Sequence, residues 1–517
     1  MAKLGGRLIP NSKMLVTMPS QRKLFTIILG VCAFSLILLV VHSPATLNKL
    51  PVPHALKPSH DDKAPENEPK PIYKSPPKFK PPPIKDNFPL LSSEGKNKTP
   101  PIPSWNVAPK DLWTQYNLPI APPLLIGFTR SWPMLQQTVV SYITAGWPAS
   151  QIYVVENTGT QQANARGQLS LQNPFYLNHT VLKDILGVNV IQTPTLLNFA
   201  QLQNFFLAQS YEHQWPYYFW SHMDVLAFAH EDGNEKNNAK WNEEGYKSLY
   251  AMALTVLKDA RDNDPRWGIR FFAYDHLALV NREAYEDVGG WDTLIPYYIT
   301  DCDMHSRLTM RDWTMKDARW IGQIWDVSVV LDDLSVLYRV DGLTPSFTDP
   351  NPPPPAAKKG WWKKDREEEE VKKKQKRQEV VAPRGSRGVK EALMIKREDE
   401  RQSQEQMKEG EHKEGEHKMG ELEKWKALMA TADKMFHYKH DSERGRNTWQ
   451  LGQQGGQGEP FYYPAEGIAR GIELLTETGK VIYSEKWGHK DCALITKARL
   501  KFDDQWMVKK DWGPFSK

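Results

Sequence analysis

Short apolar runs alternate with amphipathic segments along the chain from residue 124 onward. Four of these runs have the length of a buried strand, namely residues 124–128, 152–155, 188–191 and 217–220. Apolar side chains within residues 197–208 recur at helical spacing. Strands separated by helices predict an α/β domain in which helices flank a mostly parallel sheet. Ligands of such sheets bind beyond the carboxyl ends of the strands, so we expect a site there.

A separate apolar run covers residues 24–41 and contains no charged residue. As a helix it would measure about 27 Å, close to the thickness of the bilayer's hydrocarbon core. Basic residues precede it, which predicts a cytosolic tail at residues 1–23 and a membrane anchor at residues 24–41. A cleaved signal peptide is the alternative, but the leader and the apolar run are both long for one.

Proline dominates the next segment, residues 42–120, with repeated Pro-Pro and Pro-Lys steps. Such a segment favours extended polyproline II and predicts a semi-stiff stem. Tail, anchor and stem together predict a single-pass type II protein of the Golgi or endoplasmic reticulum membrane, with its working domain in the lumen. Asn97 and Asn178 each begin an acceptor sequon and are candidate glycosylation sites.

The segment at residues 350–434 differs from the rest of the chain in charge. More than half of residues 358–426 are Lys, Arg, Asp or Glu. High charge with few apolar side chains predicts a disordered or solvated helical insertion. It would divide a catalytic core at residues 121–349 from a C-terminal part at residues 435–517.

Charge and cysteine content exclude several classes of protein. The formal net charge is only +5 over 517 residues, and no basic face interleaved with aromatics is present. We therefore expect no nucleic-acid partner. Three cysteines are too few for a disulfide-dense scaffold or a Cys-rich zinc module.

Three blocks carry a family resemblance. Ser221-His222-Met223-Asp224 follows the fourth strand, residues 280–292 read VNREAYEDVGGWD, and residues 298–308 read YITDCDMHSRL. Over about residues 122–345 the chain resembles family-2-like glycosyltransferases of the Rossmann-like GT-A fold. The resemblance implies an inverting enzyme that transfers a sugar from a nucleotide-diphosphosugar to a hydroxyl of a glycan or glycoconjugate.

Such a transfer needs a cation for the diphosphate, usually Mg²⁺ or Mn²⁺, and a base for the acceptor hydroxyl. The resemblance implies that Asp301 is the base and that Asp303 is its structural or metal-linked neighbour. Asp224 would bind the metal or the diphosphate, unless it only caps the following turn. His222 replaces the first acid of the family's Asp-x-Asp pattern, and Thr300 replaces a glutamate; imidazole can still bind Mn²⁺.

The resemblance also implies roles in substrate binding. Glu156 and Asn204 would contact the base or ribose of the donor, and Arg130 would assist the diphosphate. Trp291 would stack on the acceptor sugar and Asp292 would bind sugar hydroxyls. The alternatives are a solvent-facing loop acid for Glu156, a surface arginine for Arg130 and a core tryptophan for Trp291.

Many GT-A enzymes complete the metal site with a C-terminal histidine, for which His489 is the candidate, although a surface turn is the alternative. Cys302 and Cys492 are the only cysteines outside the apolar run at residues 24–41. An oxidising lumen favours their pairing. That bond would bring His489 towards Asp301 and Asp303.

One rival hypothesis belongs to another class of function. An inactive GT-A-fold protein could bind glycans or act as a scaffold. The substitutions at His222 and Thr300 favour it, whereas the presence of Asp224, Asp301 and Asp303 favours the enzyme.

Overall fold

The computed structural model describes residues 71–73, 85–92, 98–160, 162–234, 238–349, 419–441 and 455–510. The chain divides into two compact units, at residues 1–77 and 78–517. In the first unit only residues 71–73 are described, and they are irregular. Every described helix and strand lies in the second unit.

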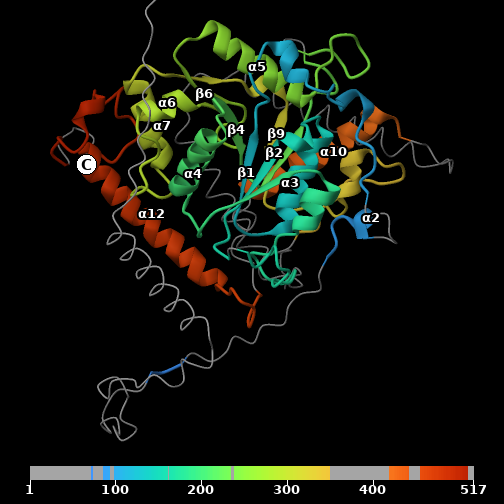
Figure 1. Ribbon diagram of the computed structural model, residues 1–517, viewed down its shortest axis with the longest axis horizontal. Helices are drawn as coiled ribbons and strands as arrows, with labels where there is room; N and C mark the ends of the chain where they lie inside the picture. Colours follow the sequence, from blue (N-terminus) through green and yellow to red (C-terminus); the bar gives the residue numbers. More distant parts are fainter. Residues whose placement is uncertain are drawn as a thin grey trace, which may run out of the picture. The chain divides into compact units, whose positions relative to one another are not determined.

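The central feature is a seven-stranded sheet in the order β3-β2-β1-β4-β7-β6-β8 (Figure 1). Its strands are β1 (Leu124–Phe128), β2 (Ile152–Glu156), β3 (Asn189–Gln192), β4 (Tyr217–Ser221), β6 (Trp267–Phe271), β7 (Leu277–Asn281) and β8 (Thr314–Asp317). The first four are parallel to one another, as predicted. β7 is antiparallel to both β4 and β6, so the sheet is mixed beyond β4.

Helices cover both faces of this sheet because side chains of each strand alternate between the faces. Leu124 and Ile126 of β1 belong to the core shared with α3 (Trp132–Thr144) and α5 (Leu249–Asn263). Leu125 belongs to the opposite core, with α4 (Phe199–Glu212), α6 (Arg282–Asp287) and α7 (Thr300–Met310). The expected α/β layering is therefore present.

A second sheet of two antiparallel strands follows β4 directly. It consists of β5 (Val225–Phe228) and β9 (Gln323–Asp326), and Val225 lies opposite Asp326. Helix α10 (Glu421–His440) contacts β9. Its early residues are already buried, since the Trp425 indole N–H donates to the Ala229 carbonyl oxygen at 3.2 Å. Helix α10 thus begins inside the segment that we predicted as the insertion.

The last long helix, α12 (Ala465–Trp487), contributes Tyr483 and Trp487 to a small separate core. The expected disulfide between Cys302 and Cys492 is present, with 5.2 Å between the Cα atoms. It joins the segment after α12 to the first turn of α7. The remaining short elements are α2 (Pro89–Ser92), 3₁₀ turns at Ser104–Asn106, Leu112–Tyr116, Ala149–Gln151, Arg319–Ile321, Leu334–Tyr338 and Phe502–Asp504, and a π-helical turn at Val181–Ile185.

The predicted fold also contained an N-terminal membrane helix, and this part of the prediction is corrected. Within the ranges given above, the structure contains no helix that is both long and apolar enough to cross a membrane. Residues 24–41 lie outside those ranges, as do the predicted tail and residues 350–418 of the insertion.

Candidate functional site

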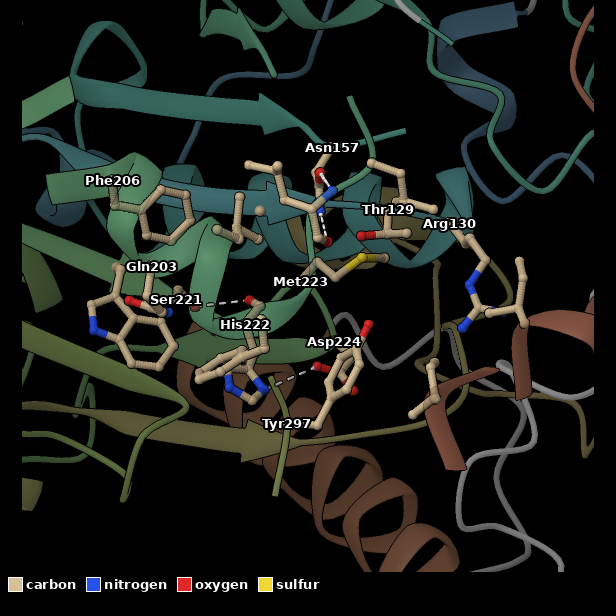
Figure 2. Close-up of a pocket in the computed structure, with 18 residues that line it drawn as sticks. Thr129, Arg130, Asn157, Gln203, Phe206, Ser221, His222, Met223, Asp224 and Tyr297 are labelled. Carbon is tan, nitrogen blue, oxygen red and sulfur yellow. Dashed lines mark hydrogen bonds and ion pairs between the residues drawn. The ribbon is translucent and has the colours of Figure 1, made fainter. Parts of the chain in front are cut away.

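A pocket of about 260 Å³ lies at the carboxyl ends of β1, β2 and β4 (Figure 2). This is where a parallel sheet is expected to bind its ligand. Its polar lining residues follow those strands: Thr129, Arg130, Asn157, Ser221, His222 and Asp224. Its apolar lining comes mainly from α4, the loop before it and α12: Leu196, Leu197, Phe199, Leu202, Phe206, Ile468 and Ile472.

Two amides in this pocket have different roles. The Asn157 side chain is fully engaged, because its Nδ2 donates to the Leu197 carbonyl at 2.9 Å and its Oδ1 accepts from the Leu197 amide at 2.7 Å. It therefore fixes the loop that forms one wall. Gln203 of α4 is 2% exposed, and its Oε1 has no hydrogen-bond partner among the described residues. A buried acceptor at a pocket wall can receive a hydrogen bond from a ligand.

Arg130 supplies a buried positive charge at the end of β1, where it is 4% exposed. Burial lowers the pKa of its guanidinium to about 10, with Tyr297 acting in the opposite direction. The group remains protonated at neutral pH. Arg130 is therefore not the surface arginine of the alternative, and its role towards a diphosphate stays a prediction.

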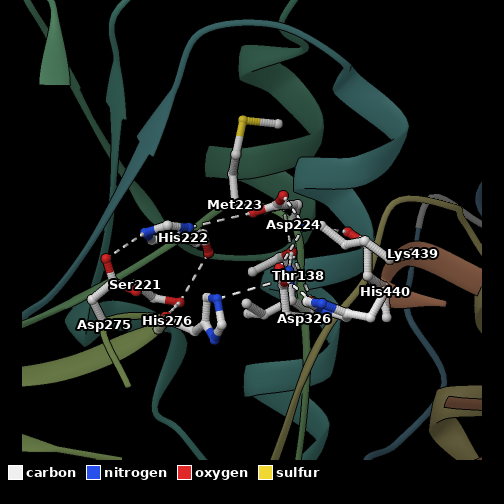
Figure 3. Close-up of polar contacts among 12 residues, drawn as sticks. Thr138, Ser221, His222, Met223, Asp224, Asp275, His276, Asp326, Lys439 and His440 are labelled. Atoms are coloured by element: carbon white, nitrogen blue, oxygen red, sulfur yellow. Dashed lines mark hydrogen bonds and ion pairs between the residues drawn. The ribbon is translucent and has the colours of Figure 1, made fainter. Parts of the chain in front are cut away.

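Asp224, at the end of β4, is held by a lysine that we did not predict (Figure 3). The Lys439 Nζ atom lies 2.9 Å from Asp224 Oδ2 and 2.5 Å from Asp326 Oδ1. The His222 ring lies 3.7 Å from the other Asp224 oxygen. Burial opposes the charge of Asp224, but Lys439 and His222 outweigh it and hold the pKa of this carboxyl well below its usual range.

The charge of His222 is set by its acidic neighbours. Its Nε2 lies 3.9 Å from Asp275 Oδ2. Burial disfavours the imidazolium, but the hydrogen bond to Asp224 and the charge of Asp275 outweigh it and raise the pKa of His222 to about 9.

The predicted metal ligands Asp224, His222 and His489 are not grouped together in the described part of the chain. Among the residues that the structure describes, no three His, Cys, Asp or Glu side chains are grouped so as to hold a metal ion. His489 is buried after α12, where its Nε2 lies 3.7 Å from Asp491. The disulfide holds this segment against α7, but Asp224 is engaged by Lys439 of α10. The residues present do not fit the expected Mn²⁺ or Mg²⁺.

The two predicted catalytic acids have contrasting surroundings. Asp301 is half-buried, and the Tyr274 hydroxyl donates to its Oδ2 at 2.7 Å. Tyr274 precedes Asp275, the partner of His222, so the turn between β6 and β7 touches both Asp301 and the end of β4. Asp301 is not among the residues that line the pocket, and its role as the base stays a prediction.

Asp303 is fully buried and cannot take part in chemistry at the surface. It accepts hydrogen bonds from Arg307 at 2.9 Å and from the Trp487 indole at 2.9 Å, and Lys486 lies at 2.8 Å. Its carboxylate attaches α12 to α7. The structural alternative that we stated for Asp303 therefore holds, and its catalytic role is withdrawn.

Two of the predicted donor-binding residues lie outside the pocket lining. Glu156 is 2% exposed, and its carboxylate accepts from Asn164 at 2.6 Å, from Gln192 at 2.8 Å and from the His179 ring at 2.9 Å. Although burial acts in the opposite direction, these hydrogen bonds lower the pKa of Glu156. It is neither a ligand residue nor a solvent-facing acid.

Asn204 is likewise engaged within the protein. Its side chain donates to the Trp291 carbonyl and accepts from the Trp291 amide, both at 2.8 Å. A Cβ atom at Gly290, where φ is +71°, would lie 2.7 Å from Asn204 Oδ1. The Gly289-Gly290 turn therefore serves this internal contact, and the pocket position on α4 is Gln203.

The predicted acceptor-binding residues are also internal. Trp291 is 4% exposed and packs edge-on against Phe199, with ring centroids 5.4 Å apart. The Asp292 carboxylate lies 2.8 Å from Lys486 Nζ. The core alternative for Trp291 is thus the observed one.

The two candidate glycosylation sites differ in their placement. Asn178 is half-buried, and its side-chain oxygen accepts a hydrogen bond from the Val181 amide at 3.0 Å. Asn97 lies outside the described residues.

Known proteins give only distant comparisons. No family model matches the chain, and no curated protein matches it. Solved structures with some likeness include the mannosyltransferase PcManGT from Pyrobaculum calidifontis in complex with GDP-Man and Mn²⁺, with 13% identity, 40% of this chain and 61% of that chain covered, and a TM-score of 0.26. GalNAc-T7 with UDP, GalNAc and Mn²⁺ is 12% identical, with 50% of this chain and 55% of that chain covered and a TM-score of 0.23.

A third structure is a cytidylyltransferase from Leptospira borgpetersenii serovar Hardjo-bovis, with 10% identity, 38% of this chain and 74% of that chain covered, and a TM-score of 0.22. The structures with some likeness to this chain are therefore glycosyltransferases and a nucleotidyltransferase. The chain spans less than two thirds of the length of either glycosyltransferase.

Proposed function

We propose that this chain is a glycosyltransferase that transfers a sugar from a nucleotide-diphosphosugar to a hydroxyl of a glycan or glycoconjugate. The observation that carries the proposal is the pocket at the ends of β1, β2 and β4, which combines an apolar slot with the buried cation of Arg130. A nucleotide-diphosphosugar has a flat base and a doubly charged diphosphate, and the two parts of the pocket match these chemically.

The nucleoside would lie between α4 and α12. Phe199 and Phe206 offer aromatic surface, and the unpartnered Gln203 Oε1 offers an acceptor for an N–H or O–H of the ligand. The diphosphate would then lie near Arg130. A guanidinium is positively charged, and its planar fork of N–H donors matches the spacing of phosphate oxygens.

The acceptor would be activated by Asp301. Its carboxylate would take the proton of the attacking hydroxyl while the sugar–diphosphate bond breaks, so that the nucleoside diphosphate leaves. Direct attack of this kind inverts the anomeric centre. Tyr274 holds the carboxylate through one oxygen, which leaves the other for the acceptor.

The disulfide supports an oxidising compartment as the place of action. Structural disulfides persist in the secretory pathway and are rare in the cytosol. We therefore include the Golgi or endoplasmic reticulum lumen in the proposal.

A donor panel tests the function. The purified chain is incubated with UDP-, GDP- and CMP-linked sugars, and the release of free nucleotide is measured alongside nucleotide binding by calorimetry. We expect hydrolysis of one donor class, and loss of binding in Arg130→Met. A chain that binds a nucleotide yet hydrolyses no donor with any acceptor would indicate the inactive glycan-binding alternative. A chain that binds no nucleotide at all would exclude the enzyme.

A further inference from the structure

Two buried carboxylates at the end of β4 share one lysine side chain. Asp224 is 7% exposed and Asp326 is 5% exposed, and the Lys439 Nζ atom lies within 3 Å of an oxygen of each. Figure 3 shows Lys439 between the two acids. This is the arrangement that a divalent cation has when two carboxylates share it.

The backbone fixes the two carboxylates beside each other. Asp326 ends β9 opposite Val225, the residue after Asp224, and the Val327 amide donates to the Asp224 carbonyl at 2.9 Å. Two ionised carboxylates placed so closely in the interior repel each other, so either one of them binds a proton or a cation lies beside them. A cation beside the pair keeps both acids ionised.

Helix α10 delivers that cation. An ammonium group has three donors, and Lys439 has three acceptors in the protein: the two carboxylates and the Val327 carbonyl at 3.3 Å. The neighbouring His440 ring reaches the other Asp326 oxygen at 2.9 Å. All three donors of Lys439 are thus directed at the protein, and none is left for a phosphate.

We propose that Lys439 takes the place of the divalent cation at the end of β4, so that this chain binds a nucleoside diphosphate without a metal ion. Lys439 neutralises the acidic pair and is a positioning residue. Arg130, on the pocket wall, is the cation that meets the diphosphate. The nucleotide part rests on the proposed function, whereas the exclusion of metal by Lys439 does not.

The first experiment uses Mn²⁺ alone as the probe. Free Mn²⁺ is titrated by electron paramagnetic resonance against the whole chain and against Lys439→Met, with Lys434→Met, an exposed lysine of the same helix, as the matched control. We expect no Mn²⁺ binding by the unaltered chain or the control, and one Mn²⁺ per chain in Lys439→Met, lost again when Asp224→Asn is added. A one-to-one site in the unaltered chain, or no gain in Lys439→Met, would overturn the proposal.

The second experiment measures UDP and GDP binding by calorimetry in EDTA and in an excess of Mn²⁺. We expect affinities that agree within about threefold in the two buffers. A tenfold or larger gain with Mn²⁺ would contradict the proposal. Failure to bind either nucleotide would count against the proposed function and leave the Mn²⁺ titration to decide the role of Lys439. Should Lys439→Met not fold, the two titrations of the unaltered chain decide it.

Discussion

Asp301 and Asp303 lie two residues apart in the first turn of α7, and their surroundings separate a candidate base from a structural anchor. Asp301 is half-buried and accepts a hydrogen bond from the Tyr274 hydroxyl. Asp303 is fully buried among Arg307, Lys486 and Trp487. Their spacing in sequence is typical of one functional pair, yet only the first can meet a ligand.

This contrast predicts opposite results for two matched substitutions. Asp301→Asn keeps the shape of the side chain but cannot accept a proton, so the rate of sugar transfer should fall by about 10²–10⁴-fold. Its melting temperature should stay within about 2 °C of the unaltered chain, which corresponds to a change of about 1 kcal/mol in the free energy of unfolding. Asp303→Asn should lower stability by about 3–5 kcal/mol, because it breaks a buried ion pair. Donor turnover and thermal melting of both variants check this. Equal stability losses in the two would contradict the distinction.

Glu156 gives a prediction about acid stability. Its folded pKa lies below the unfolded value of 4.5, so its contribution to stability is present above pH 4.5 and disappears as the pH falls through the folded pKa. Glu156→Gln should lower stability at pH 7 by about 1–3 kcal/mol, and the difference from the unaltered chain should shrink towards pH 3. Melting curves across this range test it, with the exposed Glu283→Gln as the control. A difference that does not change with pH would contradict the assignment.

Residue-scale errors of the sequence analysis share one physical cause. The position of α4 was expected, but the pocket is lined by Asn157 and Gln203, whereas the predicted Glu156 and Asn204 are bonded within the protein. Neighbouring residues of a strand point to opposite faces, and neighbours on a helix differ by about 100°. An error of one residue in register therefore exchanges a pocket-lining residue for an internal one.

At the scale of elements, the two C-terminal helices complete a site that begins on the sheet. α10 brings Lys439 to the end of β4, and α12 places Ile468 and Ile472 on the wall of the pocket. The parallel half of the sheet could be predicted because buried strands are continuous apolar runs. Neither helix could be placed from the sequence, because their contacts with the core are long-range and α10 begins within the charged segment.

The position of α12 predicts that it contributes to ligand affinity. Ile472→Glu introduces a charge into the apolar slot, so nucleotide affinity should fall at least tenfold, which corresponds to about 1.4 kcal/mol. The matched variant Leu474→Glu, at a side chain that is 52% exposed on the same helix, should bind normally. Calorimetry with UDP and GDP checks both. Unchanged binding by Ile472→Glu would show that the ligand does not reach α12.

At the scale of the whole molecule, elements on either side of the charged segment pack together. β9 ends at Asp326 and α10 begins at Glu421, and the two elements contact each other. Lys424, inside the predicted insertion, is buried and donates to the Arg339 carbonyl at 3.0 Å, so contacts with the core begin by residue 424 at the latest. Composition alone assigned these first residues of α10 to the insertion, since Glu and Lys are common in both.

Two deletions test this boundary. Replacing residues 358–418 by a short Gly/Ser linker should leave donor turnover within about twofold, because loop length has a weak effect on stability. Extending the replacement to residue 426 removes Lys424 and Trp425 and should lower the melting temperature by several degrees. Turnover and melting of both proteins are compared. A shorter deletion that fails to fold would show that residues 358–418 make contacts of their own.

The ion pair between Asp224 and Lys439 also has a consequence for the order in which the protein is made. The two residues are 215 positions apart. A ribosome must therefore synthesise the chain beyond α10 before the acids at the end of β4 meet their counter-charge, and contacts of such long range form late in folding. Until then Asp224 and Asp326 lack the ammonium group that lies within 3 Å of both. A chain that ends before α10 therefore lacks the lysine that joins β5 and β9 at this point.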